Sequence, residues 1–471
     1  MREGEALEGR QHHNVTLGVL TLAGTAFAFQ QTMVFPALPE FQRELGGTTA
    51  WVTWVLTAFL VSAAVTTPIL GRLGDQFGKE RMLLVSLGLF LAGSLGAAAA
   101  WNLESLIALR AVSGAGGALF PLAFAIIRDE FPPDRVGVGI GLLSAVFGVG
   151  GGFGIVLSGV IVDHLDWRLL FLLGSIPVAA SLALVHRYVP ESPIRTPSRV
   201  DLPGALLLSG ALLALMVPLT EGERWGWGSP ETLGLLGLSL ALFVVWGLVE
   251  LRMPSPMVDM RMLAHRPVLL TNVTTMISGF ALFSCFVLLP AFVEAPSARG
   301  YGFGATATEA GLYLLPSSVA MLFTGPLAGL VGRRTGMKWP LAGGMAAVAA
   351  AAVILSQANG EPWQVLVASG LLGGGVGAAF AAMVALIAEN VDPREMGVAT
   401  GMNTVVRLIG AVVGGQIGAA LLTTQTITGT SLPAEEAFAW AFGLSAVAAA
   451  VAAGIALAIR RQPLRRAAPA S

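Results

Sequence analysis

Long apolar runs separated by short polar segments recur along the whole chain. Each run has about the 20 residues that a helix needs to cross the hydrocarbon core of a bilayer. Backbone amides find no water there, so the runs are predicted to be helices, and they lack the short alternating pattern of a membrane β-barrel. Fourteen spans are predicted, beginning near Val15, Ala50, Met82, Glu104, Val136, Arg168, Leu202, Thr232, Val268, Thr308, Trp339, Trp363, Met396 and Ala437.

Composition supports a membrane protein. Hydrophobic residues make up 55% of the 471 residues and charged residues 12%, with a mean hydropathy of +0.76, whereas a soluble domain has about 25% charged residues. The formal net charge of -1 argues against a nucleic-acid partner, which would need a basic surplus. The single cysteine, Cys285, lies in an apolar stretch and is predicted to be a buried thiol.

Basic residues are unevenly distributed between the polar segments. If the N-terminus is cytoplasmic, most of the 27 Lys and Arg fall on the cytoplasmic side. The exceptions are Arg43, Arg168, Arg224 and Arg299 in outward loops, and Arg110 and Arg407 within spans. The positive-inside rule therefore predicts that both termini are cytoplasmic.

The chain contains an internal repeat. Pro68, Gly71, Gly74 and Gly78 match Pro326, Gly329, Gly332 and Gly336 at a shift of 258 residues. A second block, Pro133 to Gly154, matches Pro393 to Gly414 at a shift of 260. Two parallel units of six helices are predicted, with the runs 202–219 and 232–252 as additional helices between them. Parallel repeats around a midplane cavity are typical of transporters.

The predicted fold is an all-α membrane protein divided into five parts. These are a cytoplasmic tail (1–14) that carries no cleavage site for a signal peptide, an N-terminal six-helix bundle (15–190), a linker with the two additional helices (191–262), a C-terminal six-helix bundle (263–460) and a second cytoplasmic tail (461–471).

The loop after the second span carries glycines and charges in a regular order. It runs Gly-Arg-Leu-Gly-Asp-Gln-Phe-Gly-Lys-Glu-Arg from Gly71 to Arg81. Glycines such as Gly71 and Gly78 permit a tight turn and close helix approach, and the Asp75 carboxylate is expected to face the positive N-terminus of a neighbouring helix. This predicts a latch that closes the cytoplasmic face. In the second unit Arg333 stands at the position of Asp75, so the latch is predicted to be asymmetric.

Two basic residues of the same loop have candidate partners. Lys79 and Arg81 could pair with Asp129 or Glu130 at the inner end of the fourth span. The alternative for these basic residues is a solvated loop that only sets the topology.

Ionisable groups well inside the predicted spans are Arg110 and Arg407. A charge in hydrocarbon is costly and indicates a functional site by default. The alternative for Arg110 is a structural arginine bonded to helix carbonyls. No carboxylate lies well inside a span, so proton carriers would have to come from Asp75, Asp129 and Glu130.

Polar side chains of the spans are predicted to line the substrate cavity. These are Gln30, Gln31, Asn272, Asn403 and Arg407. Such a cavity favours neutral, zwitterionic or anionic amphiphiles over dicationic compounds by charge complementarity. Hydrogen bonding between helices is the alternative role of the amides.

Glycines four residues apart predict close helix packing. They are Gly148, Gly150, Gly152 and Gly154 in the fifth span, and Gly410, Gly414 and Gly418 in the thirteenth.

These motifs resemble those of the fourteen-helix drug/proton antiporters of the major facilitator superfamily. The loop from Gly71 to Arg81 resembles the signature loop of the superfamily, and the segment from Leu109 to Gly117, with Arg110, resembles the motif that helps to couple proton movement to transport. The segment from Gly148 to Gly159 resembles the antiporter motif, and that from Phe29 to Pro39 the first-helix motif.

The chain departs from the family pattern at three positions. Ile155 stands where the antiporter motif has proline, Ser158 where it has glycine, and Gln30 where the first-helix motif has aspartate. The first departure weakens the case for antiport over symport, and the last puts direct proton binding by the first helix in doubt.

The resemblance implies a major facilitator fold, with two six-helix bundles and two additional central helices. It implies a monomeric exporter of amphiphilic small molecules in the lipid of a bacterial cytoplasmic membrane, working by alternating access and in exchange for protons. It implies neither a cofactor nor a metal site.

Other classes of protein remain as alternatives. A dedicated metabolite or lipid-like carrier, working as a symporter or uniporter, would have the same fold. A channel would show rings of like polar groups. A membrane-embedded enzyme is disfavoured because the five histidines lie in tails, loops or helix ends, and neither H-E-x-x-H nor G-x-S-G occurs. A nucleotide-driven pump would need a P-loop, which is absent.

Overall fold

The chain folds into long, nearly parallel helices. The computed structural model describes residues 2–34, 37–47, 49–192, 201–254, 256–297, 301–357, 360–392, 395–424 and 433–459. The elements are α1 (Arg2–Thr32), α2 (Leu38–Leu45), α3 (Thr49–Phe77), α4 (Lys79–Ala98), α5 (Leu103–Ser113), the 3-10 helix η1 (Gly114–Ala118), α6 (Leu119–Glu130), α7 (Pro133–His164), α8 (Arg168–Tyr188), α9 (Leu202–Trp225), α10 (Pro230–Glu250), α11 (Met260–Ala264), α12 (Arg266–Glu294), α13 (Ala307–Thr335), α14 (Lys338–Gln357), α15 (Pro362–Asn390), α16 (Met396–Thr424) and α17 (Glu435–Leu457).

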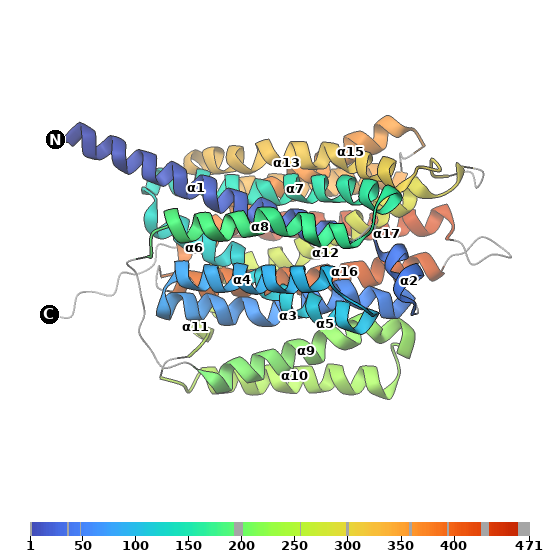
Figure 1. Cartoon of the computed structure of the whole chain (residues 1–471), viewed down its shortest axis with the longest axis horizontal. Coiled ribbons are helices and arrows are strands. Elements are labelled where there is room, and N and C mark those ends of the chain that lie inside the picture. Colours follow the sequence, from blue (N-terminus) through green and yellow to red (C-terminus); the bar gives the residue numbers. More distant parts are fainter. Residues whose placement is uncertain are drawn as a thin grey trace.

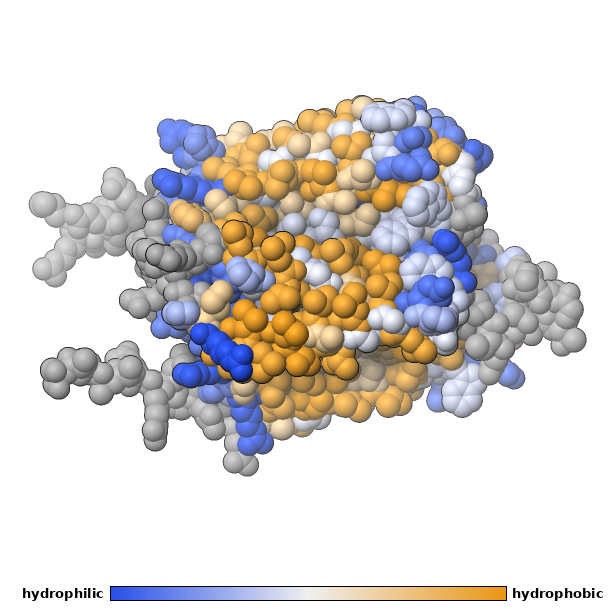
Figure 2. All heavy atoms as spheres, turned by 90° about the horizontal axis from the view of Figure 1, so that it is seen from below, coloured by the Kyte–Doolittle hydropathy of each residue, from blue (hydrophilic) through white to orange (hydrophobic). Residues whose placement is uncertain are grey.

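The helices have the length and surface of membrane spans. Within the described ranges, 13 helical segments are long and apolar enough to cross a bilayer. Helix α1 packs alongside α7 and α8 (Figure 1) and supplies the fourteenth, its hydropathy lowered by Gln30 and Gln31 near its end. Figure 2 shows a broad apolar belt with hydrophilic residues at both ends. The prediction of an all-α membrane protein is confirmed.

Two six-helix halves form the body of the bundle. The first comprises α1 and α3 to α8, with α5, η1 and α6 together making one span, and the second comprises α12 to α17. Each half has its own apolar core, around Phe27 and Phe90 in the first and Phe292 and Phe442 in the second. The halves meet along two seams, α3 with α16 and α7 with α13. The end of the bundle near which α3 ends and α16 begins is called the basic end here.

The additional helices α9 and α10 are central in the sequence but lie at one edge of the bundle (Figure 1). Helix α9 contacts both α3 and α16, so the pair covers one seam. The Trp54 indole donates a hydrogen bond to Glu221 of α9 at 2.5 Å. At the basic end, Asp201 and Glu250 accept bonds from the backbone amides of Met257 and Val258 at 3.2 and 3.3 Å.

The fourth span is not the single α-helix that the sequence predicts. Residues Gly114–Ala118 form a 3-10 turn between α5 and α6. Three of these five residues are glycines, which favour the α-helix poorly. They also let the chain press against its neighbours, because a Cβ at Gly114 would lie 2.6 Å from the Phe59 carbonyl oxygen and one at Gly116 2.8 Å from the Phe90 ring.

Several local features follow directly from the sequence. Thr306 and Glu309 form a capping box at the start of α13, with the Glu309 amide donating to the Thr306 hydroxyl at 3.2 Å. Cys285 is buried as a free thiol. The repeated glycines Gly78 and Gly336 both have positive φ, 123° and 95°, a backbone conformation that only glycine adopts easily. They make the tight turns after α3 and α13. Helix α1 begins at Arg2, so the predicted N-terminal tail is largely helical.

Candidate functional site

Repeated glycines bring the two halves together at the basic end. A Cβ on Gly71 of α3 would lie 2.6 Å from the carbonyl oxygen of Gly397 in α16. At the other seam, a Cβ on Gly329 of α13 would overlap the carbonyl oxygen of Gly137 in α7. Gly71 and Gly329 are repeat partners, as are Gly137 and Gly397. The two repeat blocks therefore contact each other across the seams, and at both places the backbones leave no room for a side chain.

Asp75 lies at the start of α16. Its carboxylate accepts hydrogen bonds from the backbone amides of Gly397 at 3.3 Å and Val398 at 3.2 Å, the first turn of that helix. The side chain is fully buried, and the Lys79 ammonium lies 3.7 Å away. A carboxylate at a helix N-terminus is favourable because the amide dipoles there are unpaired. The residue thus joins the first half to the second.

Lys79, which lies beside Asp75, also forms a buried ion pair with Asp129. The Lys79 ammonium, with no exposed surface, lies 2.5 Å from Asp129 of α6. The Ser192 hydroxyl also donates to this carboxylate. Arg81 is exposed and faces Glu191 at 3.8 Å, while Glu130 is the half-buried last residue of α6. Of the two basic residues of the loop, only Lys79 is held inside the protein.

Arg128 makes a contact between the halves that the sequence motifs did not predict. Its guanidinium donates to the backbone carbonyl of Val391 at 2.8 Å and approaches the Met396 sulfur at 3.3 Å. Val391 caps the C-terminus of α15, where unpaired carbonyls attract a cation. The only signal in the sequence is that Arg128 precedes Asp129 at the end of a span.

Glu395 is a further charged group at this seam. It immediately precedes α16 and is half-buried. Burial raises the pKa of the Glu395 carboxyl, as do the neighbouring Asp259 and Asp392 carboxylates, while Arg72 of α3 lowers it. The attraction between Arg72 and Glu395 crosses the seam, so it weakens when Glu395 takes up a proton.

A cavity of about 360 Å³ lies between the halves, away from the basic end. It is lined by residues of α1, α7, α12, α13 and α15, and extends from Gln31 and Phe380 to Glu294, the last residue of α12. Most of the lining is apolar. The lining residues are Gln31, Thr32, Gly148, Gly151, Gly152, Ile155, Leu282, Phe283, Phe286, Val287, Pro290, Glu294, Ala310, Gly311, Leu314, Ser318, Met321, Val376 and Phe380.

A smaller chamber of about 40 Å³ lies at the base of this cavity. The two spaces share Gln31, Phe283 and Phe380 as lining residues. The chamber adds Arg407, whose guanidinium lies over the Phe380 ring at 4.6 Å from its centroid, and Thr404. A mainly apolar cavity with a few convergent polar groups is the usual form of a small-molecule site.

A comparison with protein families agrees with this arrangement of two halves around a cavity. The model of the Major Facilitator Superfamily matches residues 20–415, and again residues 271–471. The chain belongs to the major facilitator superfamily. The family and the fold are those of transporters, so the prediction that the chain is not an enzyme is confirmed.

Curated relatives within the superfamily include resistance proteins. The chain is 29% identical to the tetracenomycin C resistance and export protein of Streptomyces glaucescens, over 76% of this chain and 66% of that protein. It is 31% identical to multidrug resistance protein 3 of Bacillus subtilis, over 67% and 60%, and 29% identical to a methyl viologen resistance protein of Salmonella typhimurium, over 76% and 72%. The chain thus spans less than two thirds of the length of the first two.

A solved structure shares the fold. The crystal structure of a human organic anion transporter superimposes with a TM-score of 0.66, at 15% identity, covering 94% of this chain and 99% of that one. At this identity the likeness concerns the major facilitator fold alone.

Two residues that were predicted from the sequence to take part in transport, Gln30 and Arg110, lie behind the wall of the cavity. The Gln30 amide donates to the Phe171 carbonyl of α8 at 3.4 Å, so it points between α1 and α8. Arg110 is fully buried, donates to the Val55 carbonyl at 3.3 Å, and stacks on the Phe59 ring at 4.4 Å. Phe59 itself lines the smaller chamber and separates Arg110 from it.

The predicted asparagines face each other instead of the cavity. The Asn403 amide of α16 donates to the Asn272 carbonyl oxygen and to the Thr275 hydroxyl of α12, both at 2.8 Å. Of the five predicted substrate-binding residues, Gln31 and Arg407 alone line the two spaces described above.

The predicted packing glycines lie in close helix contacts. In α7, Gly150 and Gly154 press against the backbone of α1, and Gly148 and Gly152 against Met321 and Ser318 of α13. In α16, Gly410 and Gly414 meet the α12 backbone, and Gly418 lies against the Ser284 side chain.

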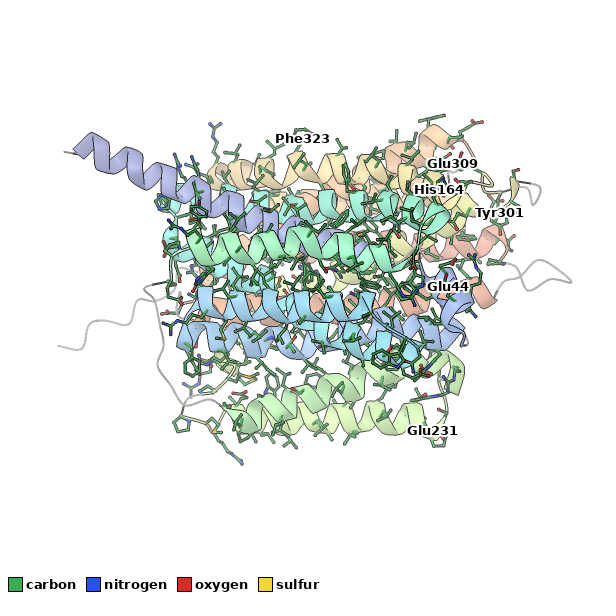
Figure 3. All side chains as sticks on the ribbon, viewed as in Figure 1. Glu44, His164, Glu231, Tyr301, Glu309 and Phe323 are labelled. Atoms are coloured by element: carbon green, nitrogen blue, oxygen red, sulfur yellow. The ribbon has the colours of Figure 1, made fainter. Side chains whose placement is uncertain are left out.

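The end opposite the basic end carries scattered polar groups, including Glu44, His164, Tyr301 and Glu309 (Figure 3). None of these four lines the cavity. Glu44 accepts a hydrogen bond from the Trp167 indole at 2.8 Å, and Glu309 caps α13. Across the described part of the chain, no group of three or more His, Cys, Asp or Glu could hold a metal ion.

Adding one methyl group at a seam should open the basic end. In Gly71→Ala, the new Cβ meets the Gly397 carbonyl only when the seam is closed. Overpacking of about 1–3 kcal/mol shifts the populations roughly 5-fold or more. Labelling of a cysteine at the buried position Ala399, in a Cys285→Ala background, should rise accordingly.

Gly88→Ala is the control for this experiment, because a Cβ at Gly88 has nothing within 4 Å. Equal labelling of the two alanine variants, with both proteins folded, would show that the seam does not open here.

Proposed function

We propose that the chain exports amphiphilic small molecules across the bacterial cytoplasmic membrane by alternating access, in exchange for protons. The observation that carries this proposal is the position of the cavity. It reaches the end opposite the basic end, between two halves whose basic ends are closed by Gly71 and Gly397 at one seam and Gly137 and Gly329 at the other. With the basic end cytoplasmic, as the positive-inside rule favours, this is an outward-facing state.

Rocking of the halves would expose the same residues to the cytoplasm. Opening the basic end requires Asp75 to leave the α16 amides and Arg128 to leave the Val391 carbonyl. Each contact joins the first half to the second, and each consists of only a few hydrogen bonds, which can break and re-form. They therefore serve in this proposal as the cytoplasmic latch, with Lys79 and Asp129 holding Asp75 in position.

The lining of the cavity supports an amphiphilic substrate. A wall of phenylalanine, leucine, isoleucine and methionine suits an apolar body, and Gln31 and Ser318 offer polar contacts. The relatives from Streptomyces and Bacillus are named for resistance to tetracenomycin C and to multiple drugs, which supports efflux and a role in resistance.

Glu294 is the carboxylate among the cavity-lining residues and faces the outward end. Protons entering from outside would meet it before any other acid of the cavity. We assign it the proton-accepting role during exchange, together with Glu395 at the basic end, in place of the acids that the sequence predicted, Asp75, Asp129 and Glu130, of which the first two are held in buried ion pairs with Lys79. The pKa of Glu395 is raised, and its attraction to Arg72 exists only while Glu395 is ionised. As the pH falls, Glu395 therefore loses this attraction at a higher pH than an ordinary glutamate would.

The test is proton release in inverted membrane vesicles with an acidic interior. A neutral aromatic amphiphile added outside should discharge the pH gradient only in vesicles that contain the chain, and Glu294→Gln should slow this discharge strongly, because a glutamine amide cannot take up a proton. Export without proton release would refute the exchange, and the absence of any movement of a labelled amphiphile would refute export.

A further inference from the structure

The smaller chamber contains a cation, Arg407, that has no charge partner in the described part of the chain. Arg407 has no ion-pair partner among the residues that the structure describes, and its guanidinium lies against the face of the Phe380 ring. A buried charge carries a desolvation cost that a partner of opposite charge offsets.

Other charges do not neutralise this cation. Arg110 is separated from the chamber by Phe59 and adds positive charge on the same side of the cavity. Glu294, the acid of the larger cavity, lies at its outward mouth, at the last residue of α12. The base of the cavity is therefore positive and its mouth negative.

The two spaces differ in size. The chamber suits the small head group of a ligand, and the larger cavity suits its apolar body. The chamber of about 40 Å³ has room for roughly two or three waters, which is about the size of a carboxylate. The space of about 360 Å³ above it lies at the lower end of the range of about 300–1,000 Å³ for drug-sized ligands. Its walls near the shared residues Phe283 and Phe380 are aromatic.

We propose that the chamber binds the single carboxylate of a monoanionic amphiphile, with Arg407 as its charge partner. The apolar body of the ligand then lies in the larger cavity, directed towards Glu294. A guanidinium pairs with a carboxylate by charge-assisted hydrogen bonds. The inference rests on the proposed function and narrows its substrate class.

Three ligands that share one ring system test the head group directly. Naphthylacetate, naphthylethanol and naphthylethylamine differ in charge and little in size, and their affinities for the purified full chain in lipid nanodiscs can be measured by titration calorimetry. The acetate should bind most tightly. Arg407→Gln should weaken its binding roughly 10- to 100-fold, as expected for a hydrogen bond to a charged group, and change binding of the alcohol less than about 3-fold.

Two matched variants complete the test. Arg407→Lys keeps the charge and should retain part of the preference for the acetate. Arg334→Gln, at an exposed position of the basic end, should change none of the affinities. Thermal unfolding of each variant checks that it is folded.

Tighter binding of the amine than of the acetate would overturn the proposal, as would an equal loss of acetate and alcohol binding in Arg407→Gln. Neither result would refute export itself. The proposed function is tested separately by the export of a neutral amphiphile in the vesicles described above.

Discussion

An Asp75→Asn variant is expected to lose transport almost completely while remaining folded. The change keeps the shape of the side chain but removes the charge that faces the amides of Gly397 and Val398. It also leaves the buried Lys79 with Asp129 as its remaining ion-pair partner. The carboxylate charge at the N-terminus of α16 stabilises the state with the closed basic end, so its loss destabilises that state.

Two measurements follow this change. If the change removes only about 2 kcal/mol of the stabilisation of the closed basic end, the rate of export in inverted vesicles should fall at least roughly 30-fold. Labelling at Ala399→Cys from the cytoplasmic side should rise, because the closed seam is depopulated. Asp166→Asn, an exposed carboxylate beside Arg168 at the opposite end, is the matched control. Normal export by Asp75→Asn would exclude the latch role.

A Gly410→Ala variant is expected to destabilise the second half severely. The added Cβ would overlap the Met276 carbonyl of α12, and overpacking costs about 1–3 kcal/mol or more when backbone must move. Helices α12 and α16 carry Phe283 and Arg407, which line the smaller chamber. Moving the helices apart should therefore lower both the unfolding temperature and the affinity for ligand.

The same helix provides a matched control. Gly415 has nothing within 4 Å of an added Cβ, so Gly415→Ala should be neutral or stabilising, since alanine favours a helix over glycine by about 1 kcal/mol. Thermal unfolding of both variants in detergent gives the comparison. Equal unfolding temperatures for the two would mean that the close contact at Gly410 is unimportant for stability.

Residues with local roles could be predicted well. The capping box of Thr306 and Glu309 depends only on two residues three positions apart at the start of α13. Lys79 was expected to pair with Asp129 or Glu130, and it lies 2.5 Å from Asp129. The first contact lies within one helix turn, and the second joins two residues of the same half at the basic end.

Residues whose role depends on the rotation of a helix could not be predicted. Gln30 and Gln31 are neighbours in the sequence, yet Gln30 bonds to α8 and Gln31 lines the cavity. Successive residues of a helix point about 100° apart, so a small rotation exchanges their environments. Asn403 is likewise turned towards Asn272 and not towards the cavity.

The sequence by itself determined the number of spans, the duplication and the charged ends, because a bilayer demands about 20 apolar residues for each helix and repeated motifs can be read directly. The tertiary structure alone decided which glycines meet across the seams, that Arg128 reaches Val391 of the other half, and that Arg110 lies behind Phe59 while Arg407 reaches the chamber. These features depend on how the helices pack and rotate against each other, which no local pattern encodes.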